Sequence, residues 1–147
     1  MRVRKAQEKD INEISRLLIM LFDQEAEFKP DYEAQKRGVG LILSNPELGI
    51  FFVLEDQGNI IGVINLLFSI STALGGKVAT LEDFIVDKSY RNKGYGTLLL
   101  KKAIQHTKES GCLRITLFTD LDNYRAQELY KKYGFNVLKM NPMRLVF

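Results

Sequence analysis

The sequence predicts a single mixed α/β (α+β) domain, in which helices cover both faces of a largely antiparallel sheet. Its 147 residues match the usual size of one domain and exclude two large ones. Alternating or continuous apolar runs predict strands, and apolar residues three or four positions apart predict helices. Read along residues 1–147, these patterns give the element order β-α-α-β-β-β-α-β-α-β-β.

The composition is that of an ordinary globular protein, with 46% hydrophobic and 27% charged residues. No apolar run approaches the roughly 20 residues of a membrane span, and the first residues lack the apolar core of a signal peptide. We therefore expect a cytoplasmic protein without membrane contact. One cysteine and one histidine argue against a zinc site, and a net charge of +3 argues against a nucleic-acid partner.

The first half of the chain predicts a strand followed by two helices. Met1–Lys5 alternates like a short strand, and Asp10 followed by Glu13 is a capping-box pattern at a helix start. A second helix is predicted from Asp31 to about Ser44, ending before Asn45-Pro46. The first helix carries apolar residues at helical spacing: Ile11, Ile14, Leu17, Leu18, Leu21 and Phe22.

A hairpin and a third long strand come next. Ile50–Glu55 and Ile60–Ser69 read as strands joined by the turn Asp56-Gln57-Gly58-Asn59. Lys77–Val86 reads as the third strand.

The second half predicts a crossover and a closing hairpin. A helix over Gly94–Ser110 joins the preceding strand to Leu113–Thr119, which makes these two strands parallel. A helix over Asn123–Tyr133 follows. Phe135–Lys139 and Met143–Phe147 are expected to form two closing strands.

The charges are unevenly distributed. Between Asp87 and Lys108 there are six basic residues against one acid, and between Asp23 and Glu33 five acids against one lysine. The first run would suit a polyanion and the second a cation, and two solvated helix faces explain the same pattern. The basic residues are Lys88, Arg91, Lys93, Lys101, Lys102 and Lys108, and the acids are Asp23, Glu25, Glu27, Asp31 and Glu33.

The most informative stretch runs from Val86 to Thr97, where a strand ends, a basic loop follows and two glycines open a helix. The first N–H groups of a helix lack internal partners and carry partial positive charge. Glycines permit close approach of an anion, and Arg91 and Lys93 add full charges. These residues predict a phosphate-binding site. The spacing fits neither the P-loop nor the dinucleotide fingerprint, since no Lys-Ser/Thr pair follows the glycines and position 99 is Leu99.

Together, Arg91-x-x-Gly94-x-Gly96 after a strand resembles the acetyl-coenzyme A motif of the GNAT superfamily of N-acetyltransferases. A second signature, Asn123-x-x-Ala126-x-x-x-Tyr130-x-x-x-Gly134-Phe135, is similar to a later helix of that family. The element order also resembles the GNAT order, so the resemblance covers essentially the whole chain.

The resemblance implies a sheet that splays between its fourth and fifth strands. There, backbone groups of the fourth strand would pair with the pantetheine arm of the cosubstrate. The pyrophosphate would rest on the N–H groups of the basic loop, with the Thr97 hydroxyl nearby. The implied cofactor-binding residues are Phe84, Ile85, Val86, Arg91, Asn92, Lys93, Gly94, Tyr95, Gly96, Thr97, Asn123 and Tyr130. Asn123 would also serve as a helix N-cap.

Two residues are implied as catalytic. Tyr130 matches the family position whose phenol protonates the leaving thiolate, and core packing beside Leu129 and Tyr133 is the alternative. Leu81-Glu82-Asp83-Phe84 is similar to the diamine and polyamine acetyltransferase branch, which makes Glu82 the candidate base or water-orienting group. A structural ion pair or a substrate-positioning role remains open for Glu82. Successive strand residues point to opposite faces, so Glu82 and Asp83 are expected to diverge.

We therefore expect an N-acetyltransferase that moves an acetyl group from acetyl-CoA to a primary amine of a small acceptor by direct attack, without a metal. The acidic stretch favours a polyamine or aminoglycoside-like acceptor, with a peptide N-terminus or a protein lysine left open. Phe28 and Tyr32 are candidates for lining the acceptor pocket. A non-catalytic coenzyme A-binding sensor or interaction module is the alternative function, and the resemblance also implies a homodimer.

Overall fold

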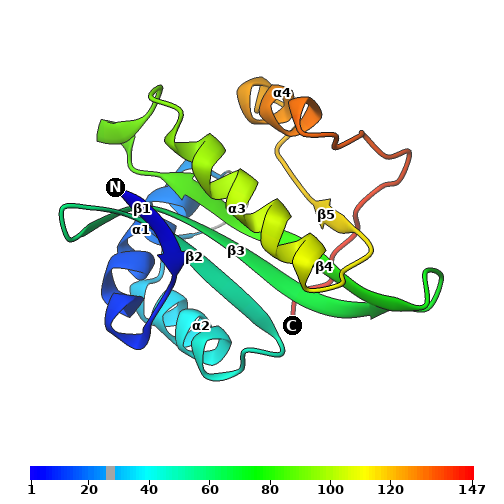
Figure 1. The fold of residues 1–147 in the computed structure, drawn as a ribbon, viewed down its shortest axis with the longest axis horizontal. Helices are drawn as coiled ribbons and strands as arrows, with labels where there is room; N and C mark the ends of the chain where they lie inside the picture. The colour runs from blue at the N-terminus through cyan, green and yellow to red at the C-terminus, as the bar shows by residue number, and fades with distance from the viewer. Residues whose placement is uncertain (26–28) are drawn as a thin grey trace.

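A computed structural model describes residues 1–25 and 29–147, with one five-stranded sheet ordered β1-β2-β3-β4-β5 (Figure 1). The strands are β1 (Arg2–Lys5), β2 (Gly49–Asp56), β3 (Asn59–Ser71), β4 (Gly76–Val86) and β5 (Ile115–Leu117). The helices are α1 (Ile11–Gln24), α2 (Tyr32–Ser44), α3 (Tyr95–Glu109) and α4 (Tyr124–Lys132), with short 3-10 turns η1 (Glu8–Asp10) and η2 (Lys88–Tyr90). Among these residues, no helix has the length and apolar character needed to cross a membrane.

The sheet separates two apolar cores. On one face, Ile14, Leu17 and Leu18 of α1 and Val39 of α2 pack against Phe51 and other strand residues. On the opposite face, α3 and α4 pack against a second cluster that contains Phe52, Leu54, Leu99, Leu100 and Tyr130. Burial on both faces explains why the central strands read as nearly continuous apolar runs. The predicted arrangement with helices on both faces is confirmed.

The pairing of the strands also follows the prediction. Strands β1 to β4 pair antiparallel, and β4 pairs parallel with β5. The turn between β2 and β3 carries positive φ at Gln57 and Gly58, the conformation of a tight hairpin turn. The register between β4 and β5 covers only Ala79–Leu81 against Ile115–Leu117. The rest of β4 runs on past β5, so the predicted splay is present.

A β-bulge interrupts β4 where it meets β3. Leu66 faces Leu81 and Ile64 faces Phe84, which leaves Asn65 opposite both Glu82 and Asp83. The backbone N–H of Asp83 donates to Oδ1 of the buried Asn65 at 2.9 Å. Leu81 and Phe84 both pack on the α3 side although they are three positions apart, so the strict alternation on which the expected divergence of Glu82 and Asp83 rested is interrupted here. Asp83 lines a cavity on the α1 and α2 side, and Glu82 is exposed.

The start of α1 is built differently from the capping box predicted at Asp10 and Glu13. The Asp10 carboxylate accepts from the backbone N–H of Gln7 at 2.7 Å and from the Arg4 guanidinium at 2.7 and 3.0 Å. Glu13 instead accepts from Arg16 at 3.1 Å. The predicted box is therefore wrong, because the half-buried Arg4 of β1 supplies a stronger, charged partner for Asp10.

The two closing strands predicted at Phe135–Lys139 and Met143–Phe147 are absent from the described structure, so its element order ends at α4. After α4 the chain is irregular, and apolar side chains such as Val137 and Met143 are exposed. An apolar stretch becomes a strand only when a sheet edge pairs with it. Here β5, the adjoining edge strand, is three residues long and offers little to pair with.

Candidate active site

The predicted phosphate loop packs the N-terminus of α3 against the end of β4. Gly94 is the N-cap of α3 and adopts a left-handed conformation with φ of +81°. A Cβ added at Gly96 would lie 3.3 Å from the Phe84 ring and 3.8 Å from Val86. A side chain at position 96 would therefore make the Phe84 ring shift by a few tenths of an ångström, because the helix start and the strand approach closely. The first N–H groups of α3 are thereby held beside the splayed part of β4.

Arg91 has a structural contact in this loop. Its Nε donates to the backbone oxygen of Val86 at 2.8 Å, which ties the loop to the end of β4. That oxygen is consequently engaged, although the resemblance implied unpaired backbone groups along Phe84, Ile85 and Val86. All three residues are in register with β3, and their open side is the side that β5 leaves uncovered.

Helix α4 brings Tyr130 to the same place. Asn123 caps α4, with its Oδ1 accepting from Ala126 N–H at 3.3 Å, as the N-cap interpretation predicted. Tyr130 is 9% exposed, and its ring centroid lies 6.3 Å from that of Phe84 and 5.7 Å from that of Phe135. The ring therefore belongs to the core. Gly96, Phe84 and Tyr130 form a continuous line of contact from the loop to α4.

The Tyr130 hydroxyl is the polar end of this buried ring. It has no hydrogen-bond partner among residues 1–25 and 29–147, and these residues contain no fully buried side-chain polar atom left without a partner. The oxygen must therefore reach solvent. Burial and the charge of Glu25 raise the pKa of Tyr130 to about 12, so the phenol keeps its proton at neutral pH.

Asp83 is the other perturbed group. Burial, followed by the charges of Glu82 and Glu25, raises the pKa of the Asp83 carboxyl to about 7. Glu82, one residue earlier, is exposed. Glu25 lies at the end of α1, and its charge acts on both Asp83 and Tyr130. The Glu25 charge thus links the end of α1 electrostatically to Asp83 of β4 and Tyr130 of α4.

Sequence reasoning missed three parts of this arrangement. It treated Glu25 only as one member of an acidic stretch and did not single out Asp83 or its support, Asn65. A polar residue inside the apolar run Ile60–Leu67 was the available signal for Asn65. Asp31 of the acidic stretch caps α2, where it accepts from Ala34 N–H at 3.2 Å. Glu27 and Phe28 lie outside the described residues.

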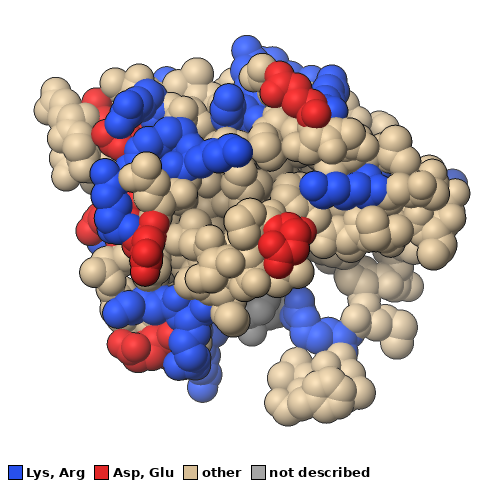
Figure 2. Space-filling view, turned by 60° about the horizontal axis from the view of Figure 1, so that its bottom comes forward, with Lys and Arg blue, Asp and Glu red and all other residues tan. Residues whose placement is uncertain are grey.

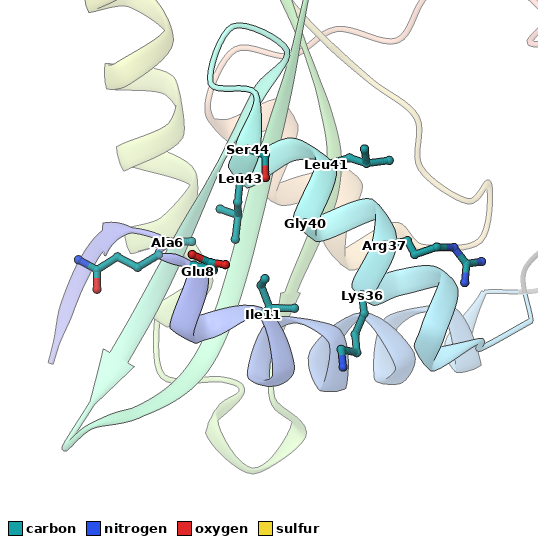
Figure 3. A pocket seen from close by; sticks show the side chains of 10 residues that line it. Ala6, Glu8, Ile11, Lys36, Arg37, Gly40, Leu41, Leu43 and Ser44 are labelled. Carbon is teal, nitrogen blue, oxygen red and sulfur yellow. The ribbon is translucent and has the colours of Figure 1, made fainter.

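The remaining features of the surface are its charge pattern and two hollows. Figure 2 shows basic and acidic side chains interspersed on one face, with no single continuous basic surface there. A hollow of about 610 Å³ lies between the connection from β1 to α1 and helix α2, and none of the predicted site residues lines it (Figure 3). A smaller cavity of about 180 Å³ lies between α1 and α2 and reaches Asp83. Within the described chain, no cluster of His, Cys, Asp and Glu is arranged to hold a metal ion.

This fold and loop are those of a known family. The model of the acetyltransferase (GNAT) family matches residues 11–135, so the chain belongs to that family. The resemblance drawn from the two motifs is thereby confirmed. A solved structure, glucosamine-6-phosphate N-acetyltransferase from Arabidopsis thaliana, has the same fold, with a TM-score of 0.77 at 22% identity over 98% of this chain and 97% of that one.

Three relatives show how sequence identity and the covered share of each chain vary. The uncharacterized N-acetyltransferase MJ1207 of Methanocaldococcus jannaschii is 35% identical over 86 residues, which are 58% of this chain and 38% of that protein. The uncharacterized N-acetyltransferase YhfO of Bacillus subtilis is 28% identical over 92% of this chain and 89% of its own length. A probable spermine N(1)-acetyltransferase of Bacillus subtilis subsp. natto is 43% identical over 37% of each chain. The chain thus spans well under two thirds of the first and third of these relatives.

The raised pKa of Asp83 can be measured directly. In carboxyl ¹³C NMR, with the signal assigned through Asp83→Asn, we expect Asp83 to titrate near pH 7. Glu82→Gln should lower that pKa, because it removes a like charge beside the carboxylate. Glu109→Gln, at the far end of α3, is the control and should leave it unchanged. Titration of Asp83 near pH 4 in the unmodified protein would contradict the described burial.

Proposed function

We propose that this protein transfers an acetyl group from acetyl-coenzyme A to the primary amine of a small acceptor by direct attack. One observation carries the proposal. Phe84 of β4 lies against both Gly96 at the start of α3 and Tyr130 of α4, and the charge of Glu25 acts on Tyr130 and on Asp83, the residue next to Phe84. These groups can supply three functions that assist acetyl transfer to an amine: an anion-binding loop, a proton acceptor and a proton donor.

The residues present fit acetyl-coenzyme A. The N–H groups from Arg91 to Gly96 would hold the pyrophosphate, with the Thr97 hydroxyl beside them. The absence of a side chain at Gly96 keeps the helix start close to Phe84 and accessible to an anion. The open edge of β4 from Phe84 onward would pair with the pantetheine arm as an added strand would. When bound, this cosubstrate supplies the acetyl thioester.

A carboxylate of the bulge would accept the proton that the acceptor amine must lose. The sequence assigned this role to Glu82, and Asp83 is favoured here over Glu82. A base works best when its pKa lies near the working pH, and Asp83 satisfies this condition. The lone pair freed on nitrogen forms the new N–C bond as the C–S bond of the thioester breaks.

Tyr130 would supply the proton that the departing sulfur takes up. Its hydroxyl has no competing hydrogen-bond partner among the described residues, and it is protonated throughout the neutral range. Starting from an ammonium group, the nitrogen loses two protons: Asp83 would accept the one lost before attack and pass it to solvent, and the second is lost to solvent as the amide forms. The sulfur takes up one proton from Tyr130, which regains it from solvent, so one proton is released overall. Each positioned proton transfer contributes about 10²–10⁴-fold, and holding amine and thioester together supplies the larger part.

A cationic amine suits the electrostatics of the site. Glu25, Glu82 and Asp83 bring three carboxyl groups to the place where the acceptor would enter, and their mutual repulsion is relieved when an ammonium group binds. The local likeness to a probable spermine N(1)-acetyltransferase points the same way.

The loop is tested by comparing two left-handed glycines. Gly94→Val and Gly58→Val should cost similar backbone strain, since φ is +81° at one and +82° at the other and both have open space around them. We expect Gly94→Val to weaken coenzyme A binding at least tenfold in calorimetry. Gly58→Val, in the distant hairpin turn, should bind normally. Equal affinities in the two variants would remove the phosphate-loop assignment.

Tyr130 is tested against its neighbour Tyr133. In an assay of thiol release from acetyl-coenzyme A across a panel of amines, Tyr130→Phe should lower kcat by about 10²-fold or more, because the proton donor is lost. Its affinity for coenzyme A should change less than twofold. Tyr133→Phe should retain wild-type kcat. Unchanged turnover in Tyr130→Phe would eliminate the proton-donor role, and thiol release with no amine despite coenzyme A binding would favour a non-catalytic module.

The roles of Glu82 and Asp83 are distinguished by how kcat/KM depends on pH in the variants of each residue. Since the base must be deprotonated, kcat/KM should fall as the pH drops below about 7 in the unmodified protein. Asp83→Asn should lower kcat/KM at all pH values and abolish this fall, the acidic limb of the pH profile. Glu82→Gln should keep the limb and move it to lower pH, because a neighbouring negative charge is gone. Loss of the limb in Glu82→Gln instead would assign the base to Glu82.

A further inference from the structure

We infer that the cavity between α1 and α2 is the acceptor subsite, and that it takes a primary amine with a short apolar substituent whose ammonium group lies against Asp83. This inference rests on the proposed function and names its substrate class. It differs from the polyamine acceptor that the acidic stretch suggested, because it places an apolar chain where a polyamine would carry a second charge.

The walls of the cavity are apolar. Leu18 and Phe22 of α1, Val39 and Ile42 of α2 and Phe51 of β2 line it, all from the core on this face of the sheet. The polar side chains among its lining residues are Gln35 and Asp83. A pocket of this kind favours a ligand that is apolar along its length and charged at one end.

The volume of the cavity limits the size of the apolar substituent. The cavity has a volume of about 180 Å³. An apolar cavity of about 150 Å³ accommodates a benzene ring. A phenyl ring or an aliphatic chain of roughly six carbons therefore fits, whereas a sugar-based amine is too large and too polar.

The charged end of the ligand is fixed by the bulge. Asn65 holds the backbone of Asp83, and the Asp83 carboxylate has no hydrogen-bond partner within residues 1–25 and 29–147. An ammonium group would supply that partner, and Glu82 and Glu25 would add attraction. The amine nitrogen would then lie beside Asp83, in the part of β4 that β5 leaves uncovered. The apolar substituent would point away from it, between α1 and α2.

A second cationic group inside the cavity is disfavoured. Beyond Asp83, Gln35 is the remaining polar side chain among the lining residues, and it cannot neutralise a charge. Removing an ammonium group from water without a paired anion costs several kcal/mol. A diamine or polyamine would have to leave its second charge outside, so it would not gain from the apolar walls.

The substitution Gly38→Leu would fill the cavity. Gly38 lies inside α2, it lines the cavity, and a Cβ added there would meet no atom within 4 Å. Gly40 lies two residues further in the same helix, with equally open space, but it lines the separate hollow of Figure 3. Replacing either glycine with leucine should favour the helix, since glycine is a poor helix former. Loss of folding is therefore not expected in either variant.

The experiment measures kcat/KM for ethylamine, butylamine, hexylamine, 2-phenylethylamine and spermidine by thiol release. We expect a rise of roughly fourfold for each methylene group up to about six carbons, which is the fold-change given by about 0.8 kcal/mol per buried methylene. Gly38→Leu should lower kcat/KM for hexylamine and 2-phenylethylamine at least tenfold more than for ethylamine. Gly40→Leu should leave the whole series unchanged.

Binding gives a readout that does not depend on turnover. Hexylammonium should shift the methyl NMR signals of Val39 and Ile42 in the unmodified protein and in Gly40→Leu, but not in Gly38→Leu. A preference for spermidine over hexylamine, rates independent of chain length, or absence of these shifts would overturn the subsite. In each of those cases amine-dependent thiol release would still support acetyl transfer. Absence of release with every amine would instead count against the proposed function.

Discussion

The bulge in β4 is the constraint on which the candidate site depends. A regular strand would send one of Glu82 and Asp83 into the apolar core beneath α3. Asn65, buried in the middle of β3, receives the Asp83 backbone N–H and stabilises the extra residue. Phe84 can then still pack against Gly96 and Tyr130, while Asp83 faces the α1 and α2 side. One irregular residue thus keeps Asp83 out of the core beneath α3 and places it at the cavity between α1 and α2, while Glu82 stays exposed.

The splay of the sheet provides the second requirement. Because β5 pairs with only three residues of β4, the far end of β4 has an open side next to the start of α3. The partly positive start of α3 lies next to this open side, and the charges of Glu82 and Glu25 act on Asp83, which lines the cavity between α1 and α2. A phosphate-bearing cosubstrate would be attracted to the first region and a cationic acceptor to the second, which would orient both before any bond changes.

Much of the fold was predictable because local patterns decide it. The hairpin turn at Gln57-Gly58, the amphipathic spacing of α1 and the glycine pair before α3 each specify their element through contacts close in sequence. The predictions that depended on partners elsewhere in the chain were the ones that were wrong. Asp10 pairs with Arg4 and with the Gln7 N–H and does not form the predicted box with Glu13, and the apolar residues after α4 lie exposed without an edge to pair with.

The properties of the candidate site likewise fall into those that the sequence predicts and those that depend on the fold. The sequence by itself determined the family, through the spacing of Arg91, Gly94 and Gly96 and of Asn123 and Tyr130, because these residues act through the local geometry of a helix start and one helix face. Only the tertiary structure decided which carboxylate carries the perturbed pKa. That property arises from burial and from the charges of Glu82 and Glu25, and Glu25 comes from α1, more than fifty positions before Asp83 in the chain. No pattern within β4 encodes the distance to another element, so the pKa follows from the fold.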